Sequence, residues 1–275
     1  MRLILLSILL ALLASPSMTW ANPFANDKFP FEEGSITYKV EGNTSGSQML
    51  YVKDHGKTTA EYTQTTTKMF GIVQQENTLT LTTPDWVYDI DLTSRSATKS
   101  VNPEKYYIEE YNKLSSADQK KVDTNAEKFG ISTVESLQGT VEKKAATILG
   151  YPCNITSMMG VKVYTASQFG LVLKTESNIM GMKSLTEATH IDKGSIPDSK
   201  FAIPSGINIL EDHEADAMAR QMAVNVIESL RTGQQPTVTA QPSEGYDGGQ
   251  EQNQEFDMND LQNQLNKLMN QQHAQ

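Results

Sequence analysis

The chain has 275 residues, of which 33 are acidic and 23 are basic, and its formal net charge is −10. This charge repels the phosphates of nucleic acids and of anionic membrane surfaces, so binding to either is disfavoured. Cys153 is the single cysteine, which excludes a disulfide within the chain, so a packed core must hold the fold together.

The first 21 residues have the layout of a secretory signal peptide. Arg2 supplies a positive charge, residues 3–13 are almost entirely apolar, and residues 19–21 form a small-x-small exit. The apolar run is shorter than the roughly 20 residues of a membrane-spanning helix, and no later stretch is apolar enough to span a bilayer. We therefore expect cleavage of residues 1–21, or cleavage after Ser17, and a secreted chain that is not an integral membrane protein.

Residues 34–100 alternate between apolar and polar side chains, which is typical of β-strands. Residues 35–40, 78–82 and 86–91 each follow this period of two, and turn residues separate the runs. Their β-branched and aromatic side chains suit a half-buried sheet. The pattern predicts an antiparallel meander in which each strand pairs with the next.

The pattern changes over residues 103–130, which are charged and favour a helix. Ser115 or Ser116 can cap this helix and Gly130 can end it. Residues 132–144 can hold another helical turn. Further strands are expected at residues 145–149, 161–165, 171–175 and 183–191, and residues 201–206 close the folded region. The layout is a sheet, a helical insertion and a second part of the sheet.

Residues 211–232 predict an amphipathic helix. Asp212 can cap it, while Glu214 and Asp216 lie in its first turn, where the helix dipole favours negative charge. The predicted apolar stripe consists of Met218, Met222, Val226 and Leu230, widened by Ala219, Ala223 and Ile227.

The last residues of the chain differ in composition from the rest. Residues 233–255 are rich in Gln, Pro, Ser, Gly and acids and predict a disordered linker. Residues 256–275 predict a short amphipathic helix that needs a partner surface, because a helix of this length is marginal alone. Its apolar seam is Met258, Leu261, Leu265 and Leu268. Residues 211–275 hold eleven of the 33 acids and three of the 23 bases.

Short motifs occur in both halves of residues 34–206. They are residues 34–38 (GSITY), 50–57 (LYVKDHGK), 86–91 (WVYDID), 150–153 (GYPC), 171–174 (LVLK), 187–191 (EATHI) and 201–204 (FAIP). With these motifs the chain resembles the periplasmic outer-membrane lipoprotein carrier (Lol-type) half-barrel superfamily, in its branch of domains of unknown function with a Gly-x-x-Cys turn.

The resemblance implies an α+β fold over residues 22–210: a curved antiparallel sheet, or half-barrel, with a helical insertion over its concave face. The C-terminal helices predicted from periodicity follow this domain and lie outside the usual pattern of the family. It also implies a bacterial periplasmic location and an apolar cavity, which some members use for acyl chains. We therefore expect a binding protein of the cell envelope and no cofactor.

Cysteine and histidine do not form a recognisable catalytic or metal site. Cys153 has no second cysteine to resolve an oxidised form, so a buried side chain is favoured over a redox or metal thiol. None of the four histidines has a partner at zinc-ligand spacing. They are His55, His190, His213 and His273.

Carboxylates and methionines also suggest structural roles. Asp89 and Asp91 share one strand face but provide too few oxygen ligands for calcium. Residues 158–159 and 180–182 carry methionines that can bind Cu(I), although methionine more often fills cores and apolar pockets. No phosphate loop or nucleophile elbow is found, which disfavours an enzyme without excluding one, since triads assemble only in space. We predict no catalytic residue and no metal site.

We therefore hypothesise that the half-barrel holds an apolar small molecule or lipid, and that residues 103–130 act as a lid over it. The candidate lining residues are Tyr38, Leu50, Val52, Leu79, Leu81, Trp86, Tyr88, Leu171 and Leu173. An alternative is a cell-envelope scaffold that docks a partner protein through the Phe256–Ala274 helix.

Overall fold

The computed structural model of the chain describes Phe24 and residues 29–69, 72–179 and 181–234. The predicted signal peptide at residues 1–21, most of the predicted linker at 233–255 and the predicted helix at 256–275 lie outside these residues. The described residues all belong to the first of two compact units of the chain, Met1–Gln234.

A single sheet of 12 strands dominates the described residues, with the order β12-β6-β5-β4-β3-β2-β1-β11-β10-β9-β8-β7. All neighbouring strands are antiparallel except β12, which runs parallel to β6. The strands are β1 (Gly34–Gly42), β2 (Thr44–Lys53), β3 (Thr58–Met69), β4 (Ile72–Thr82), β5 (Trp86–Asp91), β6 (Ser96–Val101), β7 (Thr140–Ile148), β8 (Tyr151–Met158), β9 (Val161–Ala166), β10 (Val172–Ile179), β11 (Met182–Lys193) and β12 (Asn208–Glu211).

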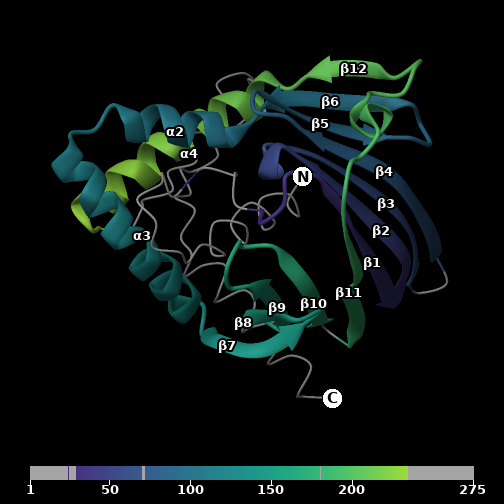
Figure 1. Cartoon of the computed structure of the whole chain (residues 1–275), viewed down its shortest axis with the longest axis horizontal. Helices are drawn as coiled ribbons and strands as arrows, with labels where there is room; N and C mark the ends of the chain where they lie inside the picture. The colour runs from purple at the N-terminus through teal and green to yellow at the C-terminus, as the bar shows by residue number, and fades with distance from the viewer. Residues whose placement is uncertain (1–23, 25–28, 70–71, 180, 235–275) are drawn as a thin grey trace, which may run out of the picture. The chain divides into compact units, whose positions relative to one another are not determined.

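Helices occupy the side on which the sheet does not close. They are α2 (Pro103–Asn112), α3 (Ser116–Ser136) and α4 (His213–Thr232), and the short 3₁₀ helices are η1 (Asp54–Gly56) and η2 (Asp198–Phe201). α3 packs against β7 and β8, and α4 packs against β6, α2 and α3. Figure 1 shows the sheet bending from β12 and β6 round to β7, with the helices between these edges. The predicted α+β half-barrel class is confirmed.

None of the helices in the described part of the chain has both the length and the apolar character that crossing a membrane requires.

The helical insertion consists of two helices rather than one. Asn102 caps α2 by accepting a hydrogen bond from the Glu104 amide, and Pro103 occupies the first turn, where its missing N–H costs nothing. The Ser115 hydroxyl accepts from the Asp118 amide at 3.2 Å, as a cap should. The prediction that Gly130 ends the helix is wrong: α3 continues to Ser136, because a helix tolerates an isolated glycine at modest cost.

The second half of the sheet also differs from the expectation. β7 begins at Thr140, and β8 follows it as a strand that the sequence analysis did not predict. Pro152 disfavours a strand there, because proline cannot donate to a ladder. The structure places Pro152 as the second residue of β8, opposite Thr147 and next to the turn, where strands tolerate proline best.

The helix α4 begins at the predicted cap, since the Asp212 carboxylate accepts from the Ala215 amide at 2.9 Å. The predicted stripe is buried in its second half and exposed at its start. Ala223, Ile227 and Leu230 are buried, whereas Met218 is 46 % exposed. α4 packs against both α2 and α3, and the three buried residues belong to the cluster that the three helices share.

The strand register assigns each side chain to one of two faces, because paired residues of neighbouring strands point to the same side of a sheet. Leu50 pairs with Ile36 and shares its face, whereas the next residue, Tyr51, points to the opposite face. We call the face of Ile36 the inner face and that of Tyr51 the outer face. The same register, followed across β11, β10 and β9, places Met158 on the inner face. Val134 of α3 and Met158 both lie against Gly139, so α3 covers the inner face.

Three apolar clusters result. The inner cluster consists of Phe31, Ile36, Tyr38, Val52, Cys153, Ala166, Phe169, Leu171, Leu173 and Ala188. The helical cluster consists of Tyr106, Tyr107, Tyr111, Val122, Ala223, Ile227 and Leu230. The outer cluster consists of Ala60, Leu79, Leu81, Ile90 and Ala97, and Phe201, Ile203 and Ile207 pack against it from the segment that leads to β12.

Candidate functional site

The residues predicted to line one cavity lie on both faces of the sheet. The inner cluster includes or contacts Tyr38, Leu50, Val52, Leu171 and Leu173. The outer cluster includes or contacts Leu79, Leu81 and Tyr88, and Trp86 lies two residues before Tyr88 on the same strand and so shares its face. The predicted lining residues therefore form two groups, one on each face of the sheet. Alternation shows which residues of one strand share a face, but only the register shows which faces of two strands match.

The inner cluster is closely packed. Ile36, Val52 and Leu173 are fully buried, with 0 % exposure. The Tyr38 hydroxyl donates a hydrogen bond to the Val172 carbonyl oxygen at 3.0 Å, which joins β1 to β10 across β11. Burial raises the pKa of this hydroxyl well above its ordinary value, and the nearby Glu61 carboxyl raises it further. Tyr38 is therefore a neutral donor within an apolar surface.

Aromatic rings close one end of the inner cluster. The Phe29 ring contacts the rings of Phe31 and Phe169 at centroid distances of 5.5 and 6.1 Å. Tyr151 meets Phe169 edge-on at 5.1 Å. Cys153 lies among them with 0 % exposure, and burial raises the pKa of its thiol. A raised pKa disfavours the thiolate that redox or metal chemistry needs.

A polar surface adjoins this cluster on the same face. Glu61 pairs with Leu50 and therefore points inward. We call the surface the polar wall; it consists of Glu61, Thr63 and Thr65 on β3 and of Glu76, Thr78 and Thr80 on β4. The sequence analysis missed it because residues 78–82 alternate threonine with leucine, and the leucines were expected to face the cavity.

The carboxyls of the polar wall interact with their surroundings in different ways. Burial raises the pKa of the Glu61 carboxyl, and the charge of Glu76 raises it further. The Thr65 hydroxyl donates to the Glu76 carboxylate at 3.3 Å. A carboxyl that stays protonated to higher pH can donate a hydrogen bond as well as accept one, so the wall offers both functions to a polar group.

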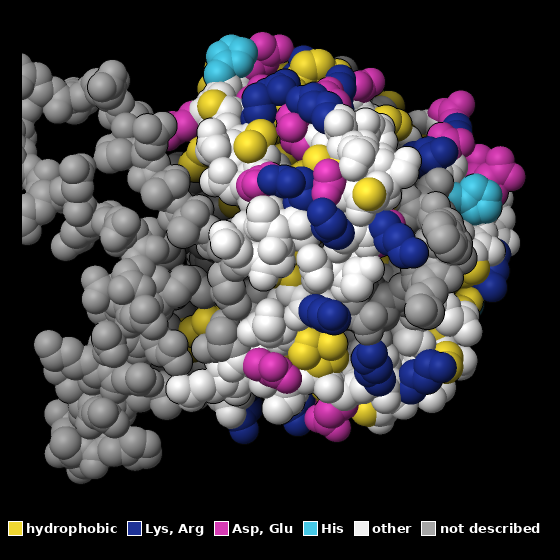
Figure 2. Space-filling view, turned by 90° about the vertical axis from the view of Figure 1, so that its left-hand side faces the viewer, with side chains coloured by type: hydrophobic (Ala, Val, Ile, Leu, Met, Phe, Trp, Pro, Cys, Tyr) yellow, Lys and Arg dark blue, Asp and Glu magenta, His cyan; other side chains and the backbone are white. Residues whose placement is uncertain are grey.

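The helical cover is held by aromatic and polar contacts. The Phe24 ring stacks on Tyr107 with centroids 5.2 Å apart. The Tyr111 hydroxyl donates to Asp123 at 2.9 Å, and the Asn125 side chain donates to the Leu230 carbonyl oxygen at 2.7 Å. The helical side faces the viewer in Figure 2, where charged side chains are spread over the surface and hydrophobic ones form separate small patches.

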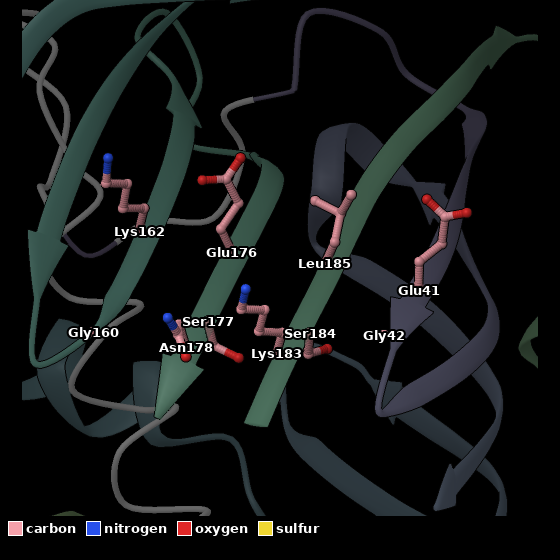
Figure 3. A pocket seen from close by; sticks show the side chains of 10 residues that line it. All are labelled: Glu41, Gly42, Gly160, Lys162, Glu176, Ser177, Asn178, Lys183, Ser184 and Leu185. Carbon is pink, nitrogen blue, oxygen red and sulfur yellow. The ribbon is translucent and has the colours of Figure 1, made fainter. Parts of the chain in front are cut away.

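The outer face carries a groove near one end of β1, β11, β10 and β9. It has a volume of about 440 Å³. Figure 3 shows Lys162, Glu176, Leu185 and Glu41 side by side across these four strands. The glycines at its rim let strands meet closely, since a Cβ on Gly42 would collide with the Lys183 carbonyl oxygen. The groove is lined mainly by charged and polar residues and lies on the opposite face from the inner cluster.

The other candidate residues have local roles. The His55 Nδ1 lies 3.1 Å from the Phe29 carbonyl oxygen, and Asp89 accepts from the Thr80 hydroxyl at 3.0 Å. Asp91 accepts from the amides of Thr93 and Ser94 in a turn. Within the residues that the structure describes, no three His, Cys, Asp or Glu side chains are grouped as a metal site requires. His273 and Met180 lie outside those residues.

No family model matches the chain, and no curated protein matches it. Among solved structures, it is similar to an uncharacterised conserved protein from Thermus thermophilus, with 7 % identity and a TM-score of 0.39, over 68 % of this chain and 94 % of that chain. It is similar to PNGF-II, with 14 % identity and a TM-score of 0.32, over 70 % of this chain and 32 % of that chain. It is similar to LprF from Mycobacterium bovis, with 8 % identity and a TM-score of 0.28, over 73 % of this chain and 98 % of that chain.

Proposed function

We propose that this chain is a secreted periplasmic binding protein that holds an amphipathic ligand against the inner face of its sheet. The ligand has an apolar chain, as an acyl chain, a lipid or a lipoprotein segment does. One observation carries the proposal: the inner cluster and the polar wall share a face and meet where Leu50 stands opposite Glu61.

The two surfaces have complementary tasks in this proposal. Burying an apolar chain against the inner cluster contributes roughly 25 cal/mol per Å² of apolar area. The threonine hydroxyls and the Glu61 carboxyl orient the polar end, since binding sites combine apolar lining with a few placed polar groups. The ligand can enter only if members of the inner cluster move apart, because they are closely packed.

Native mass spectrometry of the protein purified from a bacterial periplasm tests this function. We expect added mass that disappears on extraction with organic solvent and returns with a fatty acid or a phospholipid. A delipidated chain that takes up no fatty acid, phospholipid or lipopeptide contradicts the proposal.

Two adjacent residues of β2 provide a matched pair of variants. Leu50 contacts the inner cluster and Tyr51 contacts the outer cluster, and both are half-buried. We expect Leu50→Gln to lower uptake of a labelled fatty acid about tenfold, since a buried apolar side chain contributes about 1.5–3 kcal/mol. Tyr51→Gln is expected to leave uptake unchanged at a similar loss of stability. Equal losses of uptake in both variants indicate unfolding rather than a binding site.

Secretion is tested separately from ligand binding. We expect the chain isolated from the periplasm to begin at Asn22, two residues before Phe24. N-terminal sequencing gives the cleavage point directly. A chain found only in the cytoplasm with Met1 retained contradicts a secreted role and leaves the ligand question open to the experiments above.

A further inference from the structure

The side chains of the inner cluster differ in how firmly the backbone holds them. Ile36 and Leu173 lie on β1 and β10, each of which is paired with a neighbouring strand on both sides. Phe31 and Phe169 come instead from the segment before β1 and from the turn that joins β9 to β10. Segments of this kind open locally at a lower free energy than paired strands do. The inner cluster should therefore open first where these two rings lie.

The segment before β1 lies between this end of the inner cluster and solvent. We call residues 29–33 the strap. Phe31 is 7 % exposed and belongs to the cluster, Phe29 is half-buried, and Pro30 between them is exposed. The Phe29 ring contacts the rings of both Phe31 and Phe169, so a displacement of the strap separates the aromatic side chains that close the cluster.

One end of the strap is fixed to the sheet side of the molecule. The Glu33 carbonyl oxygen accepts a hydrogen bond from the Gly194 amide at 3.2 Å, and the Glu33 carboxylate accepts one from the Ile196 amide at 2.8 Å. These bonds hold the strap where it joins β1. The strap can therefore move only by swinging about Glu33, with Phe29 at its moving end.

A single residue of the turn η1, His55, holds the moving end. The Phe29 amide donates to the His55 carbonyl oxygen, and the His55 amide donates to the Glu32 carbonyl oxygen, both at 3.1 Å. The His55 Nδ1 lies 3.1 Å from the Phe29 carbonyl oxygen. Because a carbonyl oxygen can only accept, Nδ1 carries the proton and donates the third hydrogen bond.

The backbone of η1 is strained at the residue that holds the strap. Asp54 and His55 have φ values of 53° and 57°, in the left-handed region that side chains other than glycine rarely adopt. Strain of this kind persists only where surrounding contacts maintain it, and it is common at switch regions. The three hydrogen bonds to the strap are such contacts, so η1 and the strap hold each other in place and can release together.

We propose that the strap is the gate of the inner cluster and that His55 holds it shut. The ligand enters and leaves when the strap and the turn that carries Phe169 move apart. The proposal rests on the proposed function, because it names the route to that ligand site. A gate controls rates rather than affinity: the bonds of His55 are present both before and after the ligand passes, so weakening them speeds uptake and release alike.

Cys153 provides a native probe of the gate that needs no ligand. It is the single cysteine, is 0 % exposed and belongs to the inner cluster with Phe31 and Phe169, so a thiol reagent reaches it only when the cluster opens. We expect His55→Ala to be labelled about fivefold faster than the wild-type chain, since one hydrogen bond that holds the strap is lost. Labelling should depend only weakly on low concentrations of urea, because a local opening exposes little surface.

Two further variants serve as controls for this labelling. His190, an exposed histidine on the outer face of β11, has no part in the gate, and we expect His190→Ala to be labelled as the wild-type chain is. Tyr111→Phe removes a hydrogen bond to Asp123 that joins α2 to α3, so it tests whether the helices form the gate instead. We expect it to leave the labelling rate unchanged.

Three results of the labelling overturn the gate. The first is a rate that His55→Ala does not change. The second is a rate that rises with urea as steeply as global unfolding does, because the strap then opens only with the whole sheet. The third is an increase in Tyr111→Phe without one in His55→Ala, which assigns the opening to the helices.

Stopped-flow uptake of a fluorescent fatty acid tests the gate on the ligand itself. We expect both uptake and release to be about fivefold faster in His55→Ala, with the dissociation constant unchanged. Equal rates in His55→Ala and the wild-type chain overturn the gate and leave the ligand site standing. Absence of uptake in both contradicts the proposed function but not the opening of the strap, which the labelling of Cys153 measures without ligand.

Discussion

Tyr107 and Tyr111 lie one turn apart on α2 and differ in what their hydroxyls meet. The Tyr111 hydroxyl donates to Asp123, whereas the buried Tyr107 hydroxyl has no hydrogen-bond partner among the described residues. Burial raises the pKa of the Tyr107 hydroxyl to about 12, and burial together with the Asp123 carboxylate raises the pKa of the Tyr111 hydroxyl to about 12. A buried polar group without a partner costs stability that its removal restores.

We therefore expect Tyr107→Phe to stabilise the folded chain by about 1 kcal/mol. Tyr111→Phe removes the same atom but also a hydrogen bond, so it should destabilise the chain by about 1 kcal/mol. Urea unfolding of both variants beside the wild-type chain measures the two free energies. A loss of stability in both variants contradicts the unpartnered state of the Tyr107 hydroxyl.

The Glu61 carboxyl makes stability depend on pH. Its pKa in the folded chain is raised above the ordinary value of 4.5 by burial and by Glu76. Between the ordinary value and the raised value the unfolded chain gives up this proton while the folded chain keeps it, so stability falls as pH rises through that window. We expect Glu61→Gln to remove this loss. The free energy of unfolding of the variant should therefore rise relative to that of the wild-type chain as pH increases from 4.5, and the difference should level off above the folded pKa.

Glu176 provides a control of opposite sign. Lys174 donates to this carboxylate and lowers its pKa, so its contribution is present at neutral pH and is lost as pH falls through the folded pKa. Unfolding curves over a series of pH values should show Glu176→Gln losing stability at neutral pH and matching the wild-type chain in acid. The same pH trend for both variants contradicts the assignment of Glu61 to a buried position.

At the scale of elements, the start of α4 depends on one side chain. The Asp212 carboxylate accepts the Ala215 amide, and Glu214 and Asp216 occupy the first turn. We expect Asp212→Ala to destabilise the chain by about 1 kcal/mol, because a capping hydrogen bond is lost. Asp212→Asn keeps an acceptor and should cost only a fraction of that in thermal or urea unfolding. An alanine variant as stable as the asparagine variant contradicts the capping role.

The elements could be predicted where a local signal exists. Asp212 and Ser115 act as the caps that the sequence indicated, and the strands of residues 34–100 follow its alternation. Features that depend on contact with residues far away in the chain could not be predicted. The exposure of Met218 within the predicted stripe of α4 depends on where α2 and α3 pack, and the inward direction of Thr80 is set by its pairing with Glu61. No periodicity within one segment contains that information, which is why the polar wall was missed.

At the scale of the molecule, the pairing of β1 with β11 joins the strands before the helices to those after them. Gly34 pairs with Lys193 and Gly42 pairs with Ser184, so the contact closes a long loop of chain. Pairing over such separations is slow to form, and the sheet depends on it. The overall curved sheet was predicted through the family resemblance, whereas this junction and its bulge near Tyr38 were not.

Ile36 tests the junction, because it is fully buried and pairs with Leu50 on one side and Ile191 on the other. We expect Ile36→Ala to destabilise the chain by about 2–5 kcal/mol, as large-to-small changes in a core do. Val73→Ala, at a residue 60 % exposed, should change stability by no more than about 0.5 kcal/mol. Hydrogen exchange should show faster exchange in Ile36→Ala on both sides of the junction; a change confined to β1 and β2 contradicts its joining role.

The order of the chain has a consequence for biogenesis. Phe201, Ile203 and Ile207 cover the outer cluster, and Ile227 and Leu230 of α4 complete the helical cluster. Synthesis from the amino end delivers these pieces last. A nascent chain that has emerged only as far as β11 therefore leaves Leu79 and its neighbours open to chaperones and proteases. Translation that stops early is expected to yield a product that is degraded rather than a smaller working protein.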